Sequence, residues 1–253
     1  MIDKDKLGQI AKLNNLRIWQ QEKHYLQNLI LETLADYPLV FKGGTYLWFY
    51  YNLPRFSEDL DFTMLSPIED DLAKRVSENL KLFGVENTVK PICNSDVSLS
   101  FRISARGPLN TSIKDLCHVY VEISKREQVI EKPLALKLEA DAYVLPVKII
   151  NGMTLDEIAA EKTRAILTRN APRDVYDLYF LINSQQVKFK KELVAKKLEY
   201  YQIAFSQTLF NKKITEKQQA WKKELSGLIF AELPEFKIVE KTLIQWSKNN
   251  SFP

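Results

Sequence analysis

The stretch FKGGTYLWFYYNLPRFSEDLDF, residues 41–62, decides the predicted fold of this chain. The apolar residues 39–41 are typical of the end of a buried strand, and Gly43-Gly44-Thr45 interrupts that strand. We expect Thr45 to cap a short aromatic helix over residues 46–52. Glycines let backbone amides approach a ligand closely, and the unpaired amides at a helix start favour anions. The first half of the stretch therefore predicts a cradle for phosphate.

The second half of the stretch predicts a strand over residues 55–64 that carries two carboxylates. Side chains in a strand point the same way at every second residue, so Asp59 and Asp61 are expected on one face. Alternation places Arg55 and Ser57 on that face too, where Arg55 pairs either with a carboxylate or with phosphate. Two close carboxylates call for a cation, and Mg²⁺ binds through one or two carboxylates plus substrate phosphates. The strand therefore predicts a divalent metal site beside the glycines.

The composition is that of a globular chain with room for one large domain or two modest ones. The chain has 253 residues, of which 45% are hydrophobic, and its net charge of +4 suits a nucleic-acid partner and an ordinary surface equally. Cys93 and Cys117 show no zinc-binding spacing, so we expect reduced thiols in a cytoplasmic protein. We find neither a signal peptide nor a long apolar run, and we expect no membrane contact.

Alternating and helical patterns fill the rest of the first half of the chain. Strands are predicted over residues 85–92, 97–104 and 116–124, with one or two further strands within residues 134–150. Helices are predicted over residues 5–35 and 67–83, the second beginning with the acidic run 69–71. In strand 116–124, Glu122 shares a face with His118. By the strand pattern alone, Glu122 is a charged residue on a solvated strand face. We expect His118 and His24 to be structural.

The second half of the chain is predicted to be helical. Asn151-Gly152 predicts a turn and a boundary between domains 1–152 and 153–253. A capping box at residues 154–157 opens a helix to about residue 169. Lys162 falls on the apolar face of this helix, where a lysine is either held in a buried ion pair or points into a cleft.

Two further features of this half carry charge. Residues 170–182 predict a buried helix in which Arg173 and Asp177 can pair at a spacing of four residues. From residue 185 the chain is lysine-rich, with 13 Lys against 7 Glu. That surface is either a site for an RNA backbone or an ordinary solvated helical face.

The string KGGTYL at residues 42–47, followed by RFSEDLDF at residues 55–62, resembles the nucleotidyltransferase fold of polymerase-β-like enzymes. The full string also resembles the AbiEii/AbiGii nucleotidyltransferase toxins, which include the MenT-type toxins. The resemblance extends over motifs between residues 42 and 177. It implies an α+β fold, with a mixed β-sheet and flanking helices, and a C-terminal helical domain that completes the active site.

The resemblance also assigns roles to single residues. Asp59 and Asp61 match the metal-binding carboxylates, and Glu122 in VEIS stands where the family has an Asp. Lys162 matches a phosphate-binding lysine in an E-K-x-x-A setting, and Asp174 in the R-D-x-x-D-L string is implied to complete the active site. Asp177 either joins it or holds Arg173 or Lys162. The implied catalytic residues are Asp59, Asp61, Glu122, Lys162 and Asp174; the implied nucleotide-binding residues are Lys42, Gly43, Gly44, Thr45, Arg55, Ser57 and Lys162; the implied metal ligands are Asp59, Asp61 and Glu122.

The activity that the resemblance implies is a metal-dependent nucleotidyl transfer, with Mg²⁺ or Mn²⁺ as cofactor. A nucleotide from GTP or a CTP-like NTP passes to an RNA acceptor, which is expected to be a tRNA, and pyrophosphate is released. The protein is then a toxin with a separate AbiEi-like antitoxin as its partner. Two alternatives stay open: a nucleotidyltransferase acting on a small molecule or a protein, and a non-catalytic NTP-binding module.

Overall fold

The computed structural model of the protein describes residues 1–69 and 71–248. Asp70, in the acidic helix start predicted above, and the last five residues of the lysine-rich tail lie outside the described residues. Contacts group the chain into two units. The first unit holds residues 1–46, 58–129 and 133–152, and the second holds residues 47–57, 130–132 and 153–253. The predicted division into domains at residue 152 stays a prediction, and two short segments that precede it group with the second unit.

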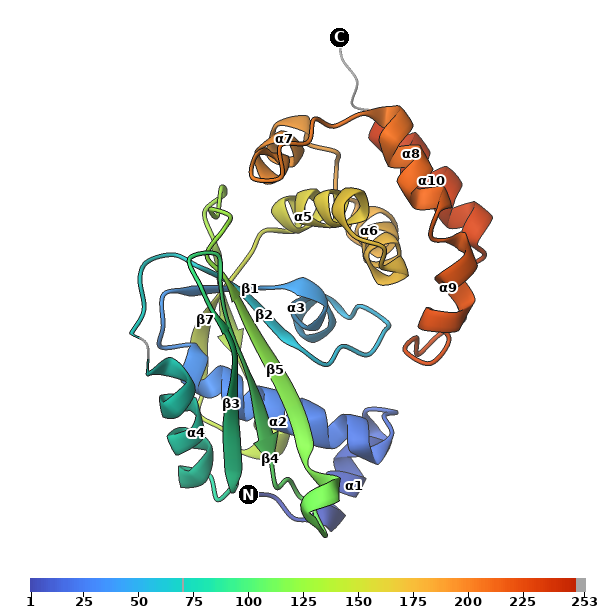
Figure 1. Cartoon of the computed structure of the whole chain (residues 1–253). Helices are drawn as coiled ribbons and strands as arrows, with labels where there is room; N and C mark the ends of the chain where they lie inside the picture. The colour runs from blue at the N-terminus through green and yellow to red at the C-terminus, as the bar shows by residue number, and fades with distance from the viewer. Residues whose placement is uncertain (70, 249–253) are drawn as a thin grey trace. The chain divides into compact units, whose positions relative to one another are not determined.

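A seven-stranded mixed sheet, counted among the described residues, forms the first unit (Figure 1). Its strands are β1 (Leu39–Lys42), β2 (Leu60–Met64), β3 (Asn87–Asn94), β4 (Ser98–Ala105), β5 (Cys117–Ser124), β6 (Leu134–Leu138) and β7 (Lys148–Gly152). They lie in the order β3-β4-β5-β2-β1-β7-β6. The central strand β2 runs antiparallel to β1 and parallel to β5, so chain segments far apart in sequence meet at the middle of the sheet. The predicted α+β fold with a mixed sheet is confirmed.

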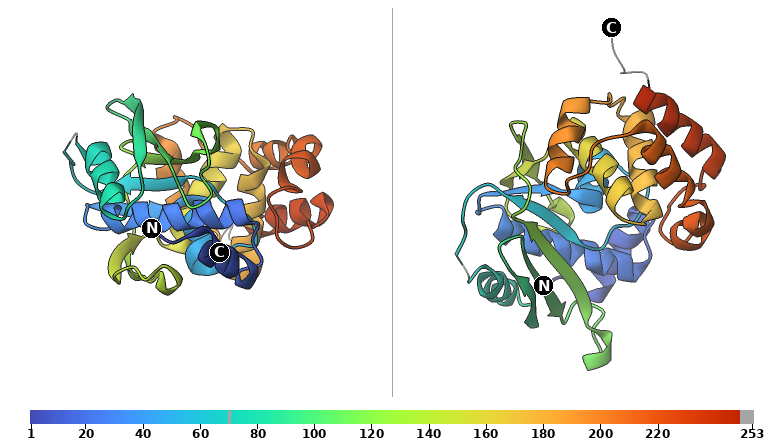
Figure 2. Two further views of the ribbon diagram at one scale, coloured as in Figure 1. Left: turned by 90° about the horizontal axis from the view of Figure 1, so that it is seen from below. Right: turned by 45° about the horizontal axis from the view of Figure 1, so that its top comes forward.

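Helices and 3₁₀ turns accompany the sheet in the described part of the first unit. They are α1 (Lys4–Leu13), α2 (Ile18–Leu34), α4 (Leu72–Leu82), η1 (Ile113–Asp115) and η2 (Asp141–Tyr143). The single helix predicted over residues 5–35 is wrong, because Asn15 adopts a positive φ of 52° and turns the chain between α1 and α2. Helix α2 contacts β5 and α4, and α4 contacts β3 (Figure 2). Buried apolar residues of both helices, such as Leu29 and Leu80, join the core of this unit.

The glycine stretch follows β1 without a loop. Helix α3 (Gly43–Tyr51) begins at the residue after β1, and Gly43 makes the turn with a φ of +79°. The prediction that Thr45 caps this helix is wrong: Thr45 lies inside the first turn, and its hydroxyl donates to the backbone carbonyl of Asp59. This bond ties the glycine turn to the segment that carries the carboxylates.

Strand β2 is shorter than the strand predicted over residues 55–64. It begins at Leu60, and residues 55–59 precede it without regular secondary structure apart from one isolated bridge between Arg55 and Ile229. Alternation along a strand therefore does not fix where Arg55 and Ser57 point. Both residues group with the second unit, whereas Asp59 and Asp61 belong to the first.

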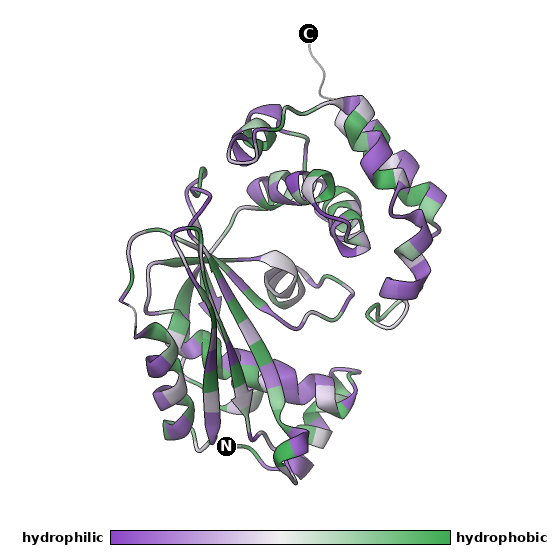
Figure 3. Cartoon of the chain, in the orientation of Figure 1, coloured by the Kyte–Doolittle hydropathy of each residue, from purple (hydrophilic) through white to green (hydrophobic). Residues whose placement is uncertain are grey.

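In the part of the second unit that the structure describes, amphipathic helices make up most of the chain (Figure 3). They are α5 (Leu155–Thr168), α6 (Pro172–Ser184), α7 (Lys191–Glu199), α8 (Gln207–Thr215), α9 (Gln218–Leu225) and α10 (Phe236–Lys248). The capping box at the start of α5 is present, because the Thr154 hydroxyl accepts a hydrogen bond from the Glu157 amide. The core of this unit includes Phe210, Trp221 and Leu243. Among the described residues, we find no helix with the length and apolarity needed to span a bilayer.

Candidate active site

The Asp61 side chain packs directly against the backbone of Gly43. A Cβ atom placed on Gly43 would come within 2.9 Å of the Asp61 Cβ and collide with its carboxylate. Only a residue without a side chain leaves this space open at a positive φ. The glycine that was predicted to cradle phosphate therefore lies directly against a carboxylate that was predicted to bind metal.

The strand register brings three of the predicted site residues into one row across the sheet. Asp61 pairs with Lys42 on β1 and with Glu122 on β5. Residues paired across neighbouring strands point to the same face, about 5 Å apart. The flanking residues Leu60 and Phe62 are fully buried, which places Asp61 on the other face. Lys42, Asp61 and Glu122 thus lie side by side, next to the turn at Gly43.

Glu122 is the exposed member of this row. Its side chain is 52% exposed and makes a long ion pair of 3.5 Å with Arg126, four residues further along the chain. An exposed pair of this kind contributes about 0–1 kcal/mol, so Glu122 is available to another partner at little cost. The other predicted carboxylate, Asp59, is half-buried and immediately precedes β2.

The oxygen donors in this row suit Mg²⁺ or Mn²⁺. Among residues 1–69 and 71–248, no three His, Cys, Asp or Glu side chains converge closely enough to hold a metal by themselves. Two carboxylates on adjacent strands nevertheless match the way Mg²⁺ is held, because phosphates and waters commonly complete its coordination. The residues present therefore fit an ion that binds together with a nucleotide, and the roles of Asp59, Asp61 and Glu122 as its ligands stay a prediction.

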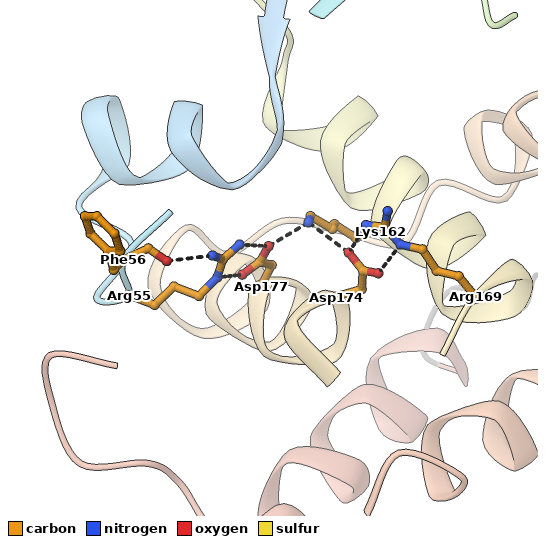
Figure 4. A network of polar contacts seen from close by, with 6 residues as sticks. All are labelled: Arg55, Phe56, Lys162, Arg169, Asp174 and Asp177. Atoms are coloured by element: carbon orange, nitrogen blue, oxygen red, sulfur yellow. Dashed lines mark hydrogen bonds and ion pairs between the residues drawn. The ribbon is translucent and has the colours of Figure 1, made fainter. Parts of the chain in front are cut away.

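The second unit contains a network of charged side chains around two buried aspartates (Figure 4). Arg55 binds Asp177 with two parallel hydrogen bonds, from Nε to Oδ1 at 2.6 Å and from Nη2 to Oδ2 at 2.7 Å. Lys162 Nζ lies 2.6 Å from Asp177 Oδ2 and 3.0 Å from Asp174 Oδ1. Arg169 closes the chain through two hydrogen bonds of 2.7 and 2.8 Å to Asp174. Three cations thus surround two carboxylates that have no exposed surface.

The charges in this network shift the pKa values of both aspartates. Burial by itself raises the pKa of Asp174, but Lys162 and Arg169 outweigh burial and hold that pKa well below its usual range. Burial likewise opposes ionisation of Asp177, and Arg55 and Lys162 lower its pKa all the same. Both carboxylates therefore stay ionised, and the cations facing them stay fixed in place.

The predicted site residues fall into two groups. Lys42, Gly43, Gly44, Thr45, Asp59, Asp61 and Glu122 belong to the first unit; Arg55, Ser57, Lys162 and Asp174 belong to the second. Of the alternatives left open by the sequence, Lys162 is in a buried ion pair, Arg55 pairs with a carboxylate, and Asp177 contacts Arg55 and Lys162 rather than Arg173. The sequence analysis did not single out Arg169. The signal that could have found it is its spacing of five residues from Asp174, across the turn between α5 and α6.

Comparisons with solved structures show where this fold occurs. JHP933 from Helicobacter pylori is similar with a TM-score of 0.65 and 20% sequence identity, over 91% of this chain and 90% of that protein. MenT4, a nucleotidyltransferase toxin from Mycobacterium tuberculosis, is similar with a TM-score of 0.65 and 19% identity, over 96% of this chain and 88% of that protein. A comparison with curated protein sequences gives no match.

The sequence itself carries the signature of a family. The model for the nucleotidyl transferase AbiEii toxin of type IV toxin–antitoxin systems matches residues 24–245, which include both groups of candidate residues. The resemblance drawn from the glycine and carboxylate motifs is thereby confirmed. This chain belongs to the AbiEii toxin family and is a nucleotidyltransferase.

Proposed function

We propose that this toxin transfers a nucleotide from an NTP to a hydroxyl group of an RNA, with release of pyrophosphate. The RNA that we propose as the acceptor is a tRNA. The row of Lys42, Asp61 and Glu122 beside the turn at Gly43 is the observation that carries the proposal. It combines a cation, two carboxylates and a glycine turn at a helix start within a few ångströms, which suits a polyphosphate and a divalent cation.

Each residue has a task in this proposal. The amides at Gly43 and Gly44 and the ammonium of Lys42 hold the triphosphate, while Asp61 and Asp59 hold Mg²⁺ or Mn²⁺. The metal, when bound, neutralises charge on the phosphates. Glu122 accepts the proton of the acceptor hydroxyl, whose oxygen forms a bond to the α-phosphorus as the bond to the pyrophosphate oxygen breaks.

The second group of residues enters the proposal through its sequence motifs. As the resemblance implies, Lys162 is proposed to bind the nucleotide phosphates and Asp174 to complete the active site. Ser57 is a further candidate for nucleotide binding, whereas Arg55 is engaged by Asp177. The contacts of Lys162 support its proposed role: Asp174 and Asp177 hold its ammonium group in one position. A cation held in this way needs no reorganisation when a phosphate arrives.

The family implies a biological setting. Because it belongs to type IV toxin–antitoxin systems, we propose that a separate AbiEi-like antitoxin counteracts this toxin. We further propose that the reaction takes place in the cytoplasm, where NTPs and tRNA are present.

A labelling experiment tests the proposal. The purified protein is incubated with Mg²⁺ or Mn²⁺, total RNA and each of the four α-labelled NTPs in turn, and the products are separated by size. We expect label in tRNA with one preferred NTP, and none with Asp59→Ala or Asp61→Ala. Asp141→Asn, an exposed aspartate of η2 in the same unit, is the control that keeps full activity.

The products decide between the alternatives. Label in a small molecule or in a protein, with the RNA unlabelled, would replace the acceptor in the proposal. Transfer that survives Asp61→Ala would overturn the assignment of the site, provided that circular dichroism shows an unchanged fold.

A further inference from the structure

The row of site residues continues across the sheet beyond Glu122. Glu122 pairs with Ser100 on β4, and Ser100 pairs with Cys93 on β3. On this part of the sheet one face is buried through residues such as Phe101, Ile103, Val119 and Val121, whereas Glu122, Tyr120 and His118 on β5 are exposed. Asp61 and Glu122 thus lie at one end of an exposed sheet face that extends across β5, β4 and β3.

Two cations lie directly opposite each other on this face. Lys90 on β3 pairs with Arg102 on β4. The ion pairs among residues 1–69 and 71–248 include neither side chain, and Arg102 Nε is buried without a hydrogen-bond partner. Like charges opposite each other on neighbouring strands are destabilising. An anion bound between them would relieve this repulsion and satisfy the arginine.

An exposed aromatic ring stands next to the two cations. Tyr120 on β5 pairs with Arg102 and is 42% exposed. His118 follows on the same face, and its Nδ1 lies 3.0 Å from the Ser104 hydroxyl. Burial, and then the charges of Arg102 and Lys23, lower the pKa of His118, so its ring is neutral at pH 7. The face therefore offers one flat aromatic side chain for stacking and two positive charges beside it.

We propose that this basic sheet face, made of Lys90, Arg102, His118 and Tyr120, binds the single-stranded end of the RNA acceptor. Phosphates bind Lys90 and Arg102, and a base stacks on Tyr120, the combination by which proteins hold single-stranded nucleic acid. Arg102 lies two strands from Asp61, about 10 Å across the sheet, so RNA on this face reaches the carboxylate row within a few nucleotides. The inference rests on the proposed function and adds to it where the acceptor lies.

Binding of fluorescent RNA tests the inference separately from catalysis. A labelled tRNA and a single-stranded RNA of the same 3′ sequence are titrated with the full chain at several salt concentrations, and anisotropy is measured. We expect the double variant Lys90→Gln/Arg102→Gln to bind both RNAs about ten- to a hundredfold more weakly. Its plot of log affinity against log salt should be shallower by about 1.4, because two phosphate contacts are lost.

Variants of the aromatic residue separate stacking from structure. Tyr120→Leu should weaken RNA binding about five- to a hundredfold, whereas Tyr120→Phe, which keeps the ring, should bind as the wild type does. Lys137→Gln on the edge strand β6, at the far side of the sheet from β3, is the matched control and should change neither affinity nor salt dependence. The double variant should unfold at or slightly above the wild-type temperature, because the repulsion between the two cations is removed, and the other variants should unfold near the wild-type temperature. All variants should keep the wild-type affinity for NTP.

Three results would overturn the inference. The first is a wild-type protein that binds neither RNA. The second is unchanged RNA affinity in both the double variant and Tyr120→Leu. The third is a labelled polyglutamate peptide that binds more tightly than RNA and loses affinity in the double variant, which would assign the face to an acidic protein. RNA binding that depends on the face, without any nucleotide transfer, would uphold the inference and overturn the proposed function.

Discussion

Single residues in this protein combine a backbone requirement with a chemical one. Gly43 shows this most clearly, because its φ of +79° and its contact with Asp61 both exclude a side chain. The two demands arise from different neighbours, the turn between β1 and α3 and the carboxylate on β2. A substitution at this position therefore affects the fold and the site at once.

We expect Gly43→Ala to abolish nucleotide transfer and to lower the free energy of unfolding by roughly 1–3 kcal/mol, since the methyl group displaces Asp61 and strains the turn. Thermal unfolding and RNA labelling measure the two effects. Gly227→Ala is the control, because a Cβ there meets no atom within 4 Å. Wild-type activity in Gly43→Ala would contradict the close packing of Asp61 on the glycine turn.

The Arg55–Asp177 pair is buried and bidentate, and a lysine cannot reproduce its two parallel hydrogen bonds. We expect Arg55→Lys to lower the free energy of unfolding by about 2–4 kcal/mol, measured by urea denaturation. Arg75→Lys is the matched control: Arg75 also binds an aspartate, Asp71, but on the surface, and its replacement should cost less than about 1 kcal/mol. Equal losses in the two variants would show that burial does not strengthen the first pair.

His24 predicts a pH dependence of stability. Burial lowers its pKa to about 4, so the unfolded chain binds a proton between about pH 6.5 and pH 4 that the folded chain does not. The stability contributed by the neutral ring is complete above pH 6.5 and is lost as the pH falls to 4, by roughly 3 kcal/mol. Urea denaturation across this range should show the fall in the wild type and in His118→Gln, and a smaller fall in His24→Gln.

At the scale of whole elements, a buried carboxylate at the start of α5 links several segments of the chain. Glu157 has no exposed surface and accepts hydrogen bonds from the amides of Ile130 and Glu131, each at 2.9 Å. Lys197 of α7 lies 2.6 Å from Glu157 and 3.1 Å from Glu161. One side chain thus joins the segment 130–132, α5 and α7.

Lys197→Met is expected to lower the free energy of unfolding by about 3–5 kcal/mol, because it leaves two carboxylates without their cation. Lys196→Met, one residue earlier in α7 and exposed, removes the same charge without an unpaired partner and should leave stability nearly unchanged. Urea denaturation of both variants measures the difference. A small loss in Lys197→Met would mean that protonation or water compensates the buried glutamates.

Elements with a strong local pattern could be predicted from the sequence, and those fixed by distant contacts could not. The alternating strand of Tyr120 and Glu122 and the capped helix of Lys162 are present as expected. The start of β2 was misplaced because residues 55–57 group with the second unit: the Phe56 amide donates to the Leu228 carbonyl, and the Phe230 amide donates to the Pro54 carbonyl. No local pattern reveals partners more than 170 residues away in sequence.

The same limit applies to the candidate site. The glycines, both aspartates and Glu122 were found because short motifs carry them, and their common row follows from the strand register. The pairing of Arg55 with Asp177 was not predictable, because it joins two motifs 122 residues apart. The basic sheet face was overlooked because its residues are spread over three strands, each with only one or two of them.

At the scale of the whole molecule, the chain passes several times between the two units. Residues 47–57 and 130–132 precede residue 152 yet bind partners that follow it, such as Leu228 and Glu157. The strands and the helices are therefore linked by more than the connection at residue 152. Neither half of the sequence contains all the contacts of its own residues.

A fragment of residues 1–152 is accordingly expected not to fold as a stable domain, although a boundary at this position is the natural prediction from sequence. We expect low solubility, or a broad thermal transition well below that of the full chain, measured by circular dichroism. The fragment also exposes apolar residues of the segment 47–57, including the buried Leu53 and Phe56. A fragment that unfolds as sharply and at the same temperature as the full chain would contradict this.

The two cysteines make the molecule easy to equip with a reporter. Burial raises the pKa of Cys117 to about 12, whereas Cys93 is exposed at the β3 end of the row that leads through Ser100 and Glu122 to Asp61. Because the thiolate is the reactive form, a maleimide dye at neutral pH attaches to Cys93 alone. The dye then sits about 14 Å, three strand spacings, from Asp61, close enough for its emission to follow nucleotide arrival in real time without any engineered change to the sequence.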